Sequence, residues 1–478
     1  MAEGHQVFAE LAAKAAKALK EEMGRGQEAL VLTHLDADGL ASAGIIAAVL
    51  ARDEKPFMVR VVNQLSQEDY EFLAKHKGPV VLTDLGSGYL EEIGKIRGQG
   101  TFIIDHHAPR GQAGEGTVHV NPHLCGIDGA REMSASGATY MVARGYDGGC
   151  SDLVAMAIVG ALGDMQDKGA KRELIGANES IVKEAEELGV LGVMEDLVFF
   201  GRESRPMYKS ISVTTEPYLP GLSGEDDAVI SLLVKSGIAL KEDDRWRTIG
   251  DLTVEEKQNI FAAIMQKLIA DGFDTAGMLE LTGKVYTLVK EDRWTPLRDA
   301  REFATLLNAC GRLGRQGVAV ALCMGERGRV LKESMALVED YRRAIRQTIE
   351  KLLVTPGAVN AYDHFTLIRG EGIVDEKMLG AVASILSASP VMKKDRPLFA
   401  TALLGDGSVR ISGRLDGNHA KAMDLGKMMS EASSKVGGTG GGHDAAAGAT
   451  IPKKRLLDFF EEVSRMVAEC ERQASTQS

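Results

Sequence analysis

Cysteine and long apolar runs are scarce in this sequence, and each shortage excludes a class of protein. Only 5 of the 478 residues are cysteine, and no two of them form a CxxC pair. This excludes a disulfide scaffold and a cysteine-rich zinc module, so we expect reduced thiols and a cytoplasmic location. No apolar run approaches the roughly 20 residues that a membrane-spanning helix needs. We therefore expect no membrane partner.

An excess of positive charge is also missing. The chain carries 68 acidic residues against 56 lysines and arginines, a formal charge of −12, which argues against a protein that coats polyanions. A nucleic-acid enzyme with a local basic groove remains compatible with this charge. The length exceeds that of one ordinary hydrophobic core, so we expect two or three domains.

Three predicted strands end in carboxylates or imidazoles. The apolar runs at 28–33, 78–83 and 101–104 lead into the segments HLDADG, DLGS and DHH. In a parallel sheet, the carboxyl ends of the strands form the crevice in which ligands bind. So many acidic and imidazole groups in one crevice are unfavourable unless cations neutralise them. The sequence therefore predicts a metal site at this edge of the sheet.

We assign two divalent ions to this site, Mn²⁺ first, with Mg²⁺ or Co²⁺ as alternatives. The predicted metal ligands are His34, Asp36, Asp38, Asp84, His106 and Asp164. Asp84 is expected to bridge the two ions. Alternatives stay open for three residues. Asp36 also fits a helix N-cap, and His34 also fits a residue that orients the ligands without binding an ion. Asp167 is either a further ligand or a surface acid.

Two neighbouring ions activate a shared water and clamp a phosphoryl group, which points to phosphodiester hydrolysis. His107 and Asp105 are the predicted catalytic residues. His107 would act as an acid or electrophile near the reacting oxygens, and Asp105 would orient the imidazoles.

The order of strands and helices predicts an α/β fold with a parallel-sheet domain and a smaller α/β domain. We expect the first domain at 1–330 with a helical insert at about 222–283, a linker helix at 331–355, and the second domain at 356–478. Within the second domain, residues 399–404 and 409–414 predict a hairpin, and residues 420–432 a helix.

A second group of residues is expected to bind the substrate. The predicted substrate-binding residues are Arg312, Ser412, Arg414, Gly441, Gly442 and His443. The glycine-rich segment 437–442 predicts a loop that offers N–H groups to an anion, with a flexible linker as the alternative. Arg414 is a candidate phosphate clamp or a surface residue. The basic loop at 311–332 is either a track for a nucleic-acid backbone or a solvated face.

The metal motifs resemble those of the DHH phosphoesterase family. HLDADG at 34–39 looks like the first motif of that family, and Asp84 like the second. DHH at 105–107 resembles the third motif, and the GD pair at 163–164, with Asp167, resembles the fourth.

The rest of the chain resembles the RecJ branch of this family. The segments SGR at 412–414 and GGGH at 440–443 look like the DHHA1 substrate-binding domain. NACGRLG at 308–314 is similar to a loop of RecJ exonucleases, and EPYLPGL at 216–222 looks most like archaeal RecJ-like proteins. This resemblance implies a metal-dependent exonuclease on single-stranded DNA or RNA in replication or repair, with GINS and the replicative helicase as partners.

Two other functions stay open. A nano-RNase or cyclic-dinucleotide phosphodiesterase uses the same two domains, although the insert and the 308–314 segment favour the exonuclease. A replisome scaffold, resembling the nuclease-dead eukaryotic helicase subunit, is disfavoured because every metal motif is intact.

Overall fold

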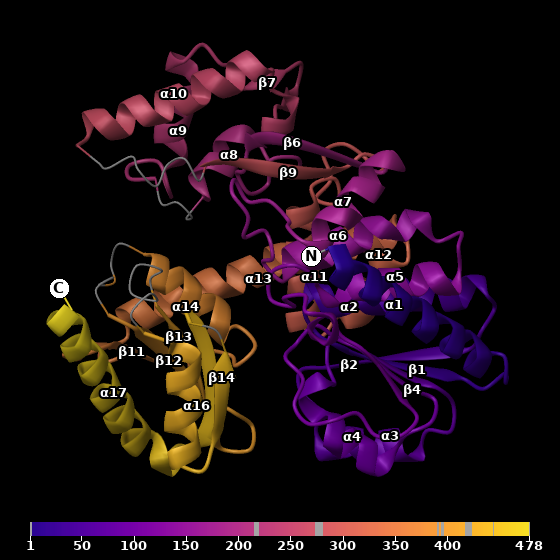
Figure 1. Ribbon diagram of the computed structural model, residues 1–478. Helices are drawn as coiled ribbons and strands as arrows, with labels where there is room; N and C mark the ends of the chain where they lie inside the picture. Colours follow the sequence, from indigo (N-terminus) through magenta and orange to yellow (C-terminus); the bar gives the residue numbers. More distant parts are fainter. Residues whose placement is uncertain are drawn as a thin grey trace. The chain divides into compact units, whose positions relative to one another are not determined.

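The computed structural model shows the α/β architecture that the sequence predicts (Figure 1). It describes residues 2–214, 219–272, 281–389, 392, 396–415, 423–442 and 444–477. The chain divides into two compact units, Met1–Val338 and Glu339–Ser478. Among the described helices, none combines the length and apolar character needed to cross a bilayer.

A five-stranded parallel sheet, in the order β2-β1-β3-β4-β5, organises the first unit. The strands are β1 (Ala29–His34), β2 (Phe57–Val62), β3 (Val80–Thr83), β4 (Thr101–Ile104) and β5 (Thr117–Val120). Thr33 pairs in register with Thr83, and Thr83 with Ile104. The polar residues that follow β1, β3 and β4 therefore emerge together at one edge, as predicted.

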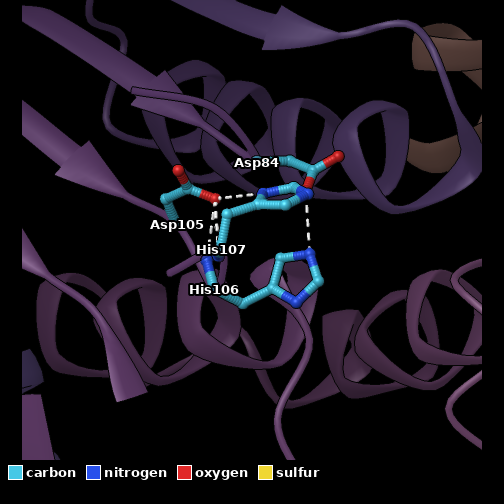
Figure 2. Close-up of side chains that lie close together, drawn as sticks. All are labelled: Asp84, Asp105, His106 and His107. Atoms are coloured by element: carbon cyan, nitrogen blue, oxygen red, sulfur yellow. Dashed lines mark hydrogen bonds and ion pairs between the residues drawn. The ribbon is translucent and has the colours of Figure 1, made fainter. Parts of the chain in front are cut away.

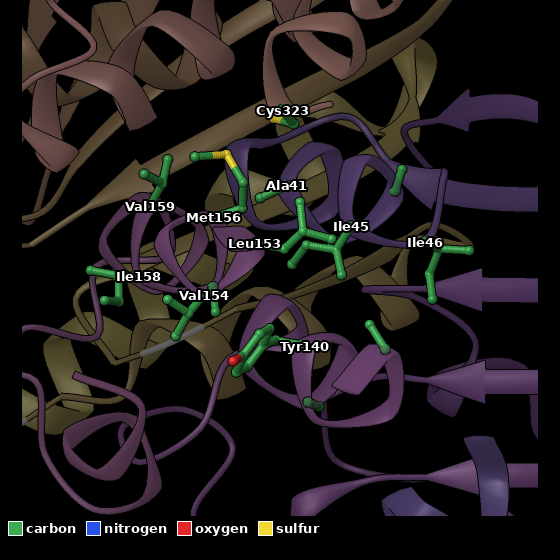
Figure 3. Packing of buried hydrophobic residues seen from close by; sticks show 14 of the residues in the cluster. Ala41, Ile45, Ile46, Tyr140, Leu153, Val154, Met156, Ile158, Val159 and Cys323 are labelled. Atoms are coloured by element: carbon green, nitrogen blue, oxygen red, sulfur yellow. The ribbon is translucent and has the colours of Figure 1, made fainter. Parts of the chain in front are cut away.

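Both faces of this sheet are buried, which explains the continuous apolar runs. Val31 of β1 faces the larger core, formed with α1 (Ala2–Met23), α2 (Ala37–Arg52), α5 (Ala135–Tyr146) and α6 (Val154–Gly163). Leu30 and Leu32 face a smaller core with α3 (Gln67–Lys75) and α4 (Leu90–Ile96). Figure 3 shows Ala41 and Ile45 of α2 in the larger core beside Leu153 and Met156.

The helix α7 (Ala177–Glu187) and two later helices also contribute to the first core. The later two are α11 (Ala300–Arg312) and α12 (Gln316–Cys323). A Cβ added at Gly44 of α2 would lie 2.2 Å from the Cβ of Cys323, so α2 and α12 cross in close contact there.

The insert is the part of the chain that follows β6 (Leu191–Leu197) and precedes β9 (Thr282–Leu288), and these two strands pair antiparallel. It has its own hydrophobic core. Its elements are α8 (Met207–Ser212), α9 (Asp226–Lys235), β7 (Lys241–Glu242), β8 (Arg245–Trp246) and α10 (Val254–Ala270). The core begins at Leu197 and Phe199, upstream of the predicted start at 222. Residues 216–218 of the predicted EPYLPGL segment lie outside the described residues.

The helix α13 (Arg329–Val354) runs from the first unit into the second and corresponds to the predicted linker helix. The second unit holds a six-stranded sheet in the order β10-β11-β12-β13-β15-β14. Its strands are β10 (Val359–Ala361), β11 (Thr366–Arg369), β12 (Leu398–Leu403), β13 (Ser408–Arg414), β14 (Thr439–Gly442) and β15 (Ala446–Pro452). Its helices are α14 (Leu379–Ala388), α16 (Leu425–Lys435) and α17 (Leu456–Gln477).

The predicted hairpin is confirmed, because β12 and β13 pair antiparallel. The helix predicted at 420–432 is Leu425–Lys435, and its N-cap Asp424 accepts a hydrogen bond from the backbone N–H of Lys427. Residues 420–422 lie outside the described residues.

The predicted glycine loop is wrong, because residues 439–442 form the edge strand β14, paired with β15. A Cβ added at Gly440 would lie 2.6 Å from the carbonyl oxygen of Met429 in α16. Glycine lets this strand lie directly against the helix backbone, and pairing with β15 satisfies the backbone groups that a loop would leave open.

Candidate metal centre

Three overlapping groups of potential ligand atoms gather at the carboxyl edge of the parallel sheet: one joins Asp84, Asp105, His106 and His107, and the other two, the ligand sets, consist of predicted ligands alone. One set comprises His34, Asp36 and Asp84, and the other comprises Asp38, His106 and Asp164. Within each set the ligand atoms lie within 4.8 Å of one another. The structure therefore brings together all the residues that the sequence predicted as metal ligands.

Asp84 lies between the two sets. Its Oδ1 is 3.3 Å from Nε2 of His106, and its Oδ2 is 3.4 Å from Nδ1 of His34. The side chain is 1% exposed, yet neither oxygen has a hydrogen-bond partner among the described residues. A buried carboxylate that accepts no hydrogen bond is costly unless positive charge neutralises it, from the neighbouring imidazoles or from bound cations. Both oxygens of Asp84 thus fit a bridging position between two cations.

The backbone at Asp84 is strained, with φ at 58°. Residues other than glycine adopt such positive φ values rarely, and they do so most often at functional sites. Figure 2 shows the Asp84 carboxylate beside the rings of His106 and His107, with Asp105 on the far side of His107. The strained turn after β3 therefore presents the carboxylate to the imidazoles that follow β4.

The two carboxylate oxygens of Asp36 make different contacts. Its Oδ1 accepts a hydrogen bond of 3.0 Å from the backbone N–H of Gly39 and caps α2. Its Oδ2 lies 3.0 Å from Nδ1 of His34. The N-cap and ligand interpretations of Asp36 are therefore compatible, since each uses a different oxygen.

Asp38 belongs to the first turn of α2 and is fully buried against the first turn of α5. Its oxygens accept hydrogen bonds from the backbone N–H groups of Ala135, at 2.8 Å, and Ser136, at 3.0 Å. Burial, with the neighbouring charge of Asp84, raises the pKa of Asp38. A cation bound by Asp38, His106 and Asp164 would lower the pKa of Asp38 again. The N-terminus of α5, which donates two hydrogen bonds to this carboxylate, already acts in that direction.

His106 is held by a carbonyl that the sequence did not reveal. Its Nδ1 is 2.6 Å from the carbonyl oxygen of Gly129, so we assign the proton to Nδ1. Nε2 is then the nitrogen available to a metal, 3.3 Å from Asp84 and 3.9 Å from Asp38. Although burial opposes this, the neighbouring carboxylates raise the pKa of His106 well above its ordinary value, so a bound cation would replace a proton on Nε2. Fixing the tautomer through the second ring nitrogen is how proteins commonly prepare a histidine for a metal.

Gln166 holds the other side of this set. It is fully buried, and its amide nitrogen donates to Oδ2 of Asp164 and to the carbonyl oxygen of Gly129, both at 2.8 Å. Its own carbonyl accepts a 2.7 Å hydrogen bond from Asn178. Sequence reasoning missed Gln166 and Asn178; the signal for Gln166 was its position two residues after Asp164.

Asp105 is saturated by hydrogen bonds. Its Oδ1 accepts from Nδ1 of His107 and from the backbone N–H of His106, both at 2.8 Å, and its Oδ2 accepts from the N–H of Ser87 at 2.8 Å. Although burial opposes this, these donors and the charge of His107 hold the pKa of Asp105 well below its ordinary value. Asp105 thus orients the His107 ring.

His107 is the exposed member of the cluster, with 57% of its side chain accessible. Burial lowers its pKa, but the hydrogen bond and the charge of Asp105 outweigh that effect and raise the pKa to about 8. The ring is therefore largely protonated near neutral pH.

Asp167 belongs to neither ligand set among the described residues. Its Oδ2 accepts hydrogen bonds of 3.0 and 2.9 Å from the guanidinium of Arg301. This geometry favours a structural ion pair over a metal ligand.

Three family models match the chain. They are the DHH family N-terminal domain at residues 28–161, the DHH-CID domain at 199–282 and the DHHA1 domain at 363–469. An uncharacterized protein of Methanocaldococcus jannaschii is 32% identical over 470 residues, which cover 95% of this chain and 97% of that protein. The chain belongs to the DHH/DHHA1 family.

Solved structures with the same fold include two RecJ proteins, one of them described as an exonuclease, and CDC45. RecJ of Thermus thermophilus in complex with Mn²⁺ has a TM-score of 0.57 and 17% identity, covering 96% of this chain and 55% of RecJ. The chain thus spans about half of that protein. A second RecJ bound to manganese has a TM-score of 0.52 and 18% identity, covering 96% and 94%. CDC45 of Entamoeba histolytica has a TM-score of 0.60 and 12% identity, covering 97% and 99%.

The segment predicted as a RecJ-like loop in the DHH domain is helical, which corrects the prediction. Residues 308–312 form the last turn of α11, and Arg312 is the last residue of that helix. The basic loop predicted at 311–332 is also largely helical, because α12 and the start of α13 lie within it. Asn308 accepts a hydrogen bond from Ala37, so this turn lies against the metal centre. Arg315 is 57% exposed and pairs with Glu333 at 3.2 Å.

In the DHHA1 domain, most of the predicted substrate residues lie on β13 and β14, the two strands that flank β15. Ser412 and Gly441 both pair in register with Gly448. Arg414 donates hydrogen bonds to Oγ of Ser384, at 2.7 Å, and Oγ of Ser412, at 3.1 Å. Gly442 pairs with Ala447, beside Gly441. His443 lies outside the described residues.

Proposed function

We propose that this chain is a metal-dependent exonuclease that hydrolyses phosphodiester bonds of single-stranded DNA or RNA. The observation that carries the proposal is the buried Asp84 carboxylate, whose two oxygens accept no hydrogen bond among the described residues and lie 3.3 and 3.4 Å from one imidazole of each ligand set. Membership of the DHH/DHHA1 family supports phosphoester hydrolysis. The likeness in fold to two RecJ proteins, one of them described as an exonuclease, supports the choice of a nucleic-acid substrate.

The donor atoms fit two divalent ions, one in each ligand set, with Asp84 between them. Carboxylate and imidazole ligands suit Mn²⁺, Mg²⁺ and Co²⁺; the RecJ relatives were solved with manganese, and we expect Mn²⁺ first. Bound in this way, the ions would supply an activated water and neutralise charge on the phosphate.

The residues of the chain carry the remaining tasks. His107, exposed and largely protonated, would donate a proton to the leaving oxygen, and the hydrogen bond to Asp105 would keep its ring in that orientation. Ser412, Arg414 and Gly441 of the DHHA1 domain are proposed to hold the phosphate and sugar of the terminal nucleotide, together with Gly442 and His443. Arg312 and Arg315 are proposed to contact the backbone of longer strands.

Two further parts of the proposal concern the cellular process and the compartment in which the protein acts. The likeness in fold to CDC45 supports a place in replication or repair, with GINS and the replicative helicase as partners. The five cysteines are free, which suits a reducing, cytoplasmic compartment. A replisome scaffold without activity is the second candidate, because the same likeness favours it; the complete ligand sets favour the enzyme.

The deciding experiment measures hydrolysis of labelled single strands of increasing length, DNA and RNA, with Mn²⁺ and with EDTA. The exonuclease predicts stepwise shortening of long strands that EDTA abolishes. Rapid cleavage of dinucleotides alone would favour the nano-RNase alternative, and no cleavage of any substrate would favour the scaffold.

Asp84→Ala tests the metal centre directly. We expect a loss of about a thousandfold or more in turnover and a loss of Mn²⁺ binding in calorimetry, because one carboxylate serves both ions. Asp152→Asn, which removes a surface carboxylate paired with Arg52, is the control and leaves both unchanged. Near-normal turnover of Asp84→Ala in Mn²⁺ would contradict the two-ion arrangement.

A further inference from the structure

The last turn of α11 lies against the turn that joins β1 to α2. Oδ1 of Asn308 accepts a 2.9 Å hydrogen bond from the backbone N–H of Ala37. Ala37 is the first residue of α2 and is fully buried. It separates Asp36 from Asp38, which belong to different ligand sets.

The hydrogen bond from Ala37 has a clear structural need. The first N–H groups of an α-helix have no partner within the helix. In α2, the N–H of Gly39 is capped by Asp36, whereas that of Ala37 is satisfied by Asn308 from a distant segment. Because Ala37 is buried, loss of the Asn308 oxygen would leave its N–H without a partner, a costly state that the turn would relieve by moving.

Close backbone contacts hold the same turn on two sides. A Cβ added at Gly311 of α11 would lie 1.8 Å from the carbonyl oxygen of Leu35. A Cβ added at Gly163, the last residue of α6, would lie 2.5 Å from the Cβ of Ala37. The contacts that hold the turn are thus made by residues 35 and 37. The predicted ligands are residues 34, 36 and 38, which alternate with them along the chain.

We propose that Asn308 is a positioning residue for the metal centre: by holding the N–H of Ala37, it sets the direction in which Asp36 and Asp38 leave the turn. The inference rests on the proposed function, since it assumes that these carboxylates bind ions. Asn308 itself takes no part in ligation. The segment at 308–314, which resembles a loop of RecJ exonucleases, would thus serve the ions.

The test compares Asn308→Ala, which removes the acceptor, with Asn308→Asp, which keeps an acceptor oxygen. Thr305→Ala is the matched control on α11, because the Thr305 hydroxyl donates a hydrogen bond to the carbonyl oxygen of Arg301 within the same helix. The first measurement is amide hydrogen exchange of Ala37 in the metal-free, full-length protein. We expect exchange at least about tenfold faster in Asn308→Ala and near wild-type exchange in the other two variants.

The second measurement is Mn²⁺ binding by calorimetry, with kcat and KM measured in parallel. Loss of a group that orients metal ligands typically weakens affinity about 10- to 100-fold. We expect that loss for Asn308→Ala, at least partial rescue by Asn308→Asp, and a fall in kcat without a matching rise in KM for the nucleic acid.

Several outcomes overturn the inference. Unchanged exchange at Ala37 in Asn308→Ala would do so, as would unchanged Mn²⁺ affinity. Equally faster exchange in β3 would assign Asn308 a general role in stability. If the wild-type protein binds no Mn²⁺, the proposed function fails, while the exchange of Ala37 still decides whether Asn308 holds the turn.

Discussion

Buried polar atoms in the metal centre are of two kinds. The oxygens of Asp105 and Asp38 and the amide of Gln166 are occupied by hydrogen bonds, whereas the oxygens of Asp84 and Nδ1 of His34 have ion-pair contacts but no hydrogen bond among the described residues. Occupied atoms set orientation, and those without a hydrogen bond are available for a ligand. This distinction separates residues that hold the site from residues that would bind the ions.

Gln166→Met tests the holding role at the residue scale. Methionine keeps the length of the side chain but cannot donate to Asp164 or to the carbonyl of Gly129. We expect Mn²⁺ affinity to fall by about tenfold or more, because both Asp164 and His106 lose their fixed orientation. Calorimetry measures the affinity, and circular dichroism controls for the fold. Wild-type affinity would assign Gln166 to packing alone.

The ligands could be predicted from the sequence, and their supports could not. His34, Asp84 and His106 follow buried strands directly, so local pattern places them at one sheet edge. The partner of Ala37 is 271 residues away in the sequence, and Gly129 contributes only a backbone carbonyl, which any residue type possesses. Contacts of this kind depend on tertiary packing and leave no mark on local sequence.

At the scale of elements, α11 connects the insert to the metal centre. Near its first turn, Glu302 accepts hydrogen bonds from the backbone N–H of Glu203, at 3.0 Å, and from the hydroxyl of Ser204. At its last turn, Asn308 holds Ala37. One helix therefore contacts both the base of the insert and the first ligand turn.

Glu302 gives a prediction for the pH dependence of stability. Burial, reinforced by the charge of Asp299, raises its pKa from 4.5 to about 8. The folded chain thus binds this proton more tightly than the unfolded chain, so the contribution of Glu302 to stability is complete below pH 4.5 and is lost as the pH rises towards 8. Glu302→Gln keeps the shape and removes the titration.

We expect the melting temperature of the wild-type protein to fall by a few degrees more than that of Glu302→Gln between about pH 5.5 and pH 8. Differential scanning calorimetry across this range provides the measurement. Parallel curves for the two proteins would show that Glu302 is already ionised in the folded state at pH 5.5.

The strand β14 shows where element prediction fails. Glycine is depleted in strands and enriched in turns, so residues 439–442 predict a loop. Close contact with the backbone of α16 and pairing with β15 override that preference. By contrast, β12 and β13 flank a GDG turn, a strong local signal for a hairpin, and their pairing was predicted correctly.

At the scale of the whole molecule, the metal centre lies in the first unit and β14 in the second. Gly441 allows their tasks to be separated, because a Cβ added there meets no described atom within 4 Å. We expect Gly441→Val to raise KM for single strands about tenfold by obstructing close approach of the backbone to a phosphate. Mn²⁺ affinity and melting temperature should not change.

Gly405→Val is the control for this variant. Gly405 lies in the turn between β12 and β13, and an added Cβ there also meets no described atom within 4 Å. Equal effects of the two substitutions would mean that β14 has no special role in substrate capture.

The basic residues after α11 give the last prediction, which concerns the path of a long strand. Arg312→Ala and Arg315→Ala, singly and combined, should raise KM for long single strands and leave dinucleotide hydrolysis nearly unchanged. Each lost phosphate contact should flatten the slope of log affinity against log salt by about 0.7, because fewer counterions are released. Arg343→Ala, which removes an exposed arginine paired with Asp340 on α13, is the charge-matched control.

The two arginines need not behave alike. Arg312 follows Gly311, which contacts the first ligand turn, so its loss also risks disturbing the metal centre. Arg315 is exposed and lies farther along the chain. A dinucleotide activity that falls with Arg312→Ala but not with Arg315→Ala would therefore indicate support of the ligand turn, whereas a shared effect confined to long strands would indicate a common binding track. Only the second result extends the substrate path beyond the terminal nucleotides.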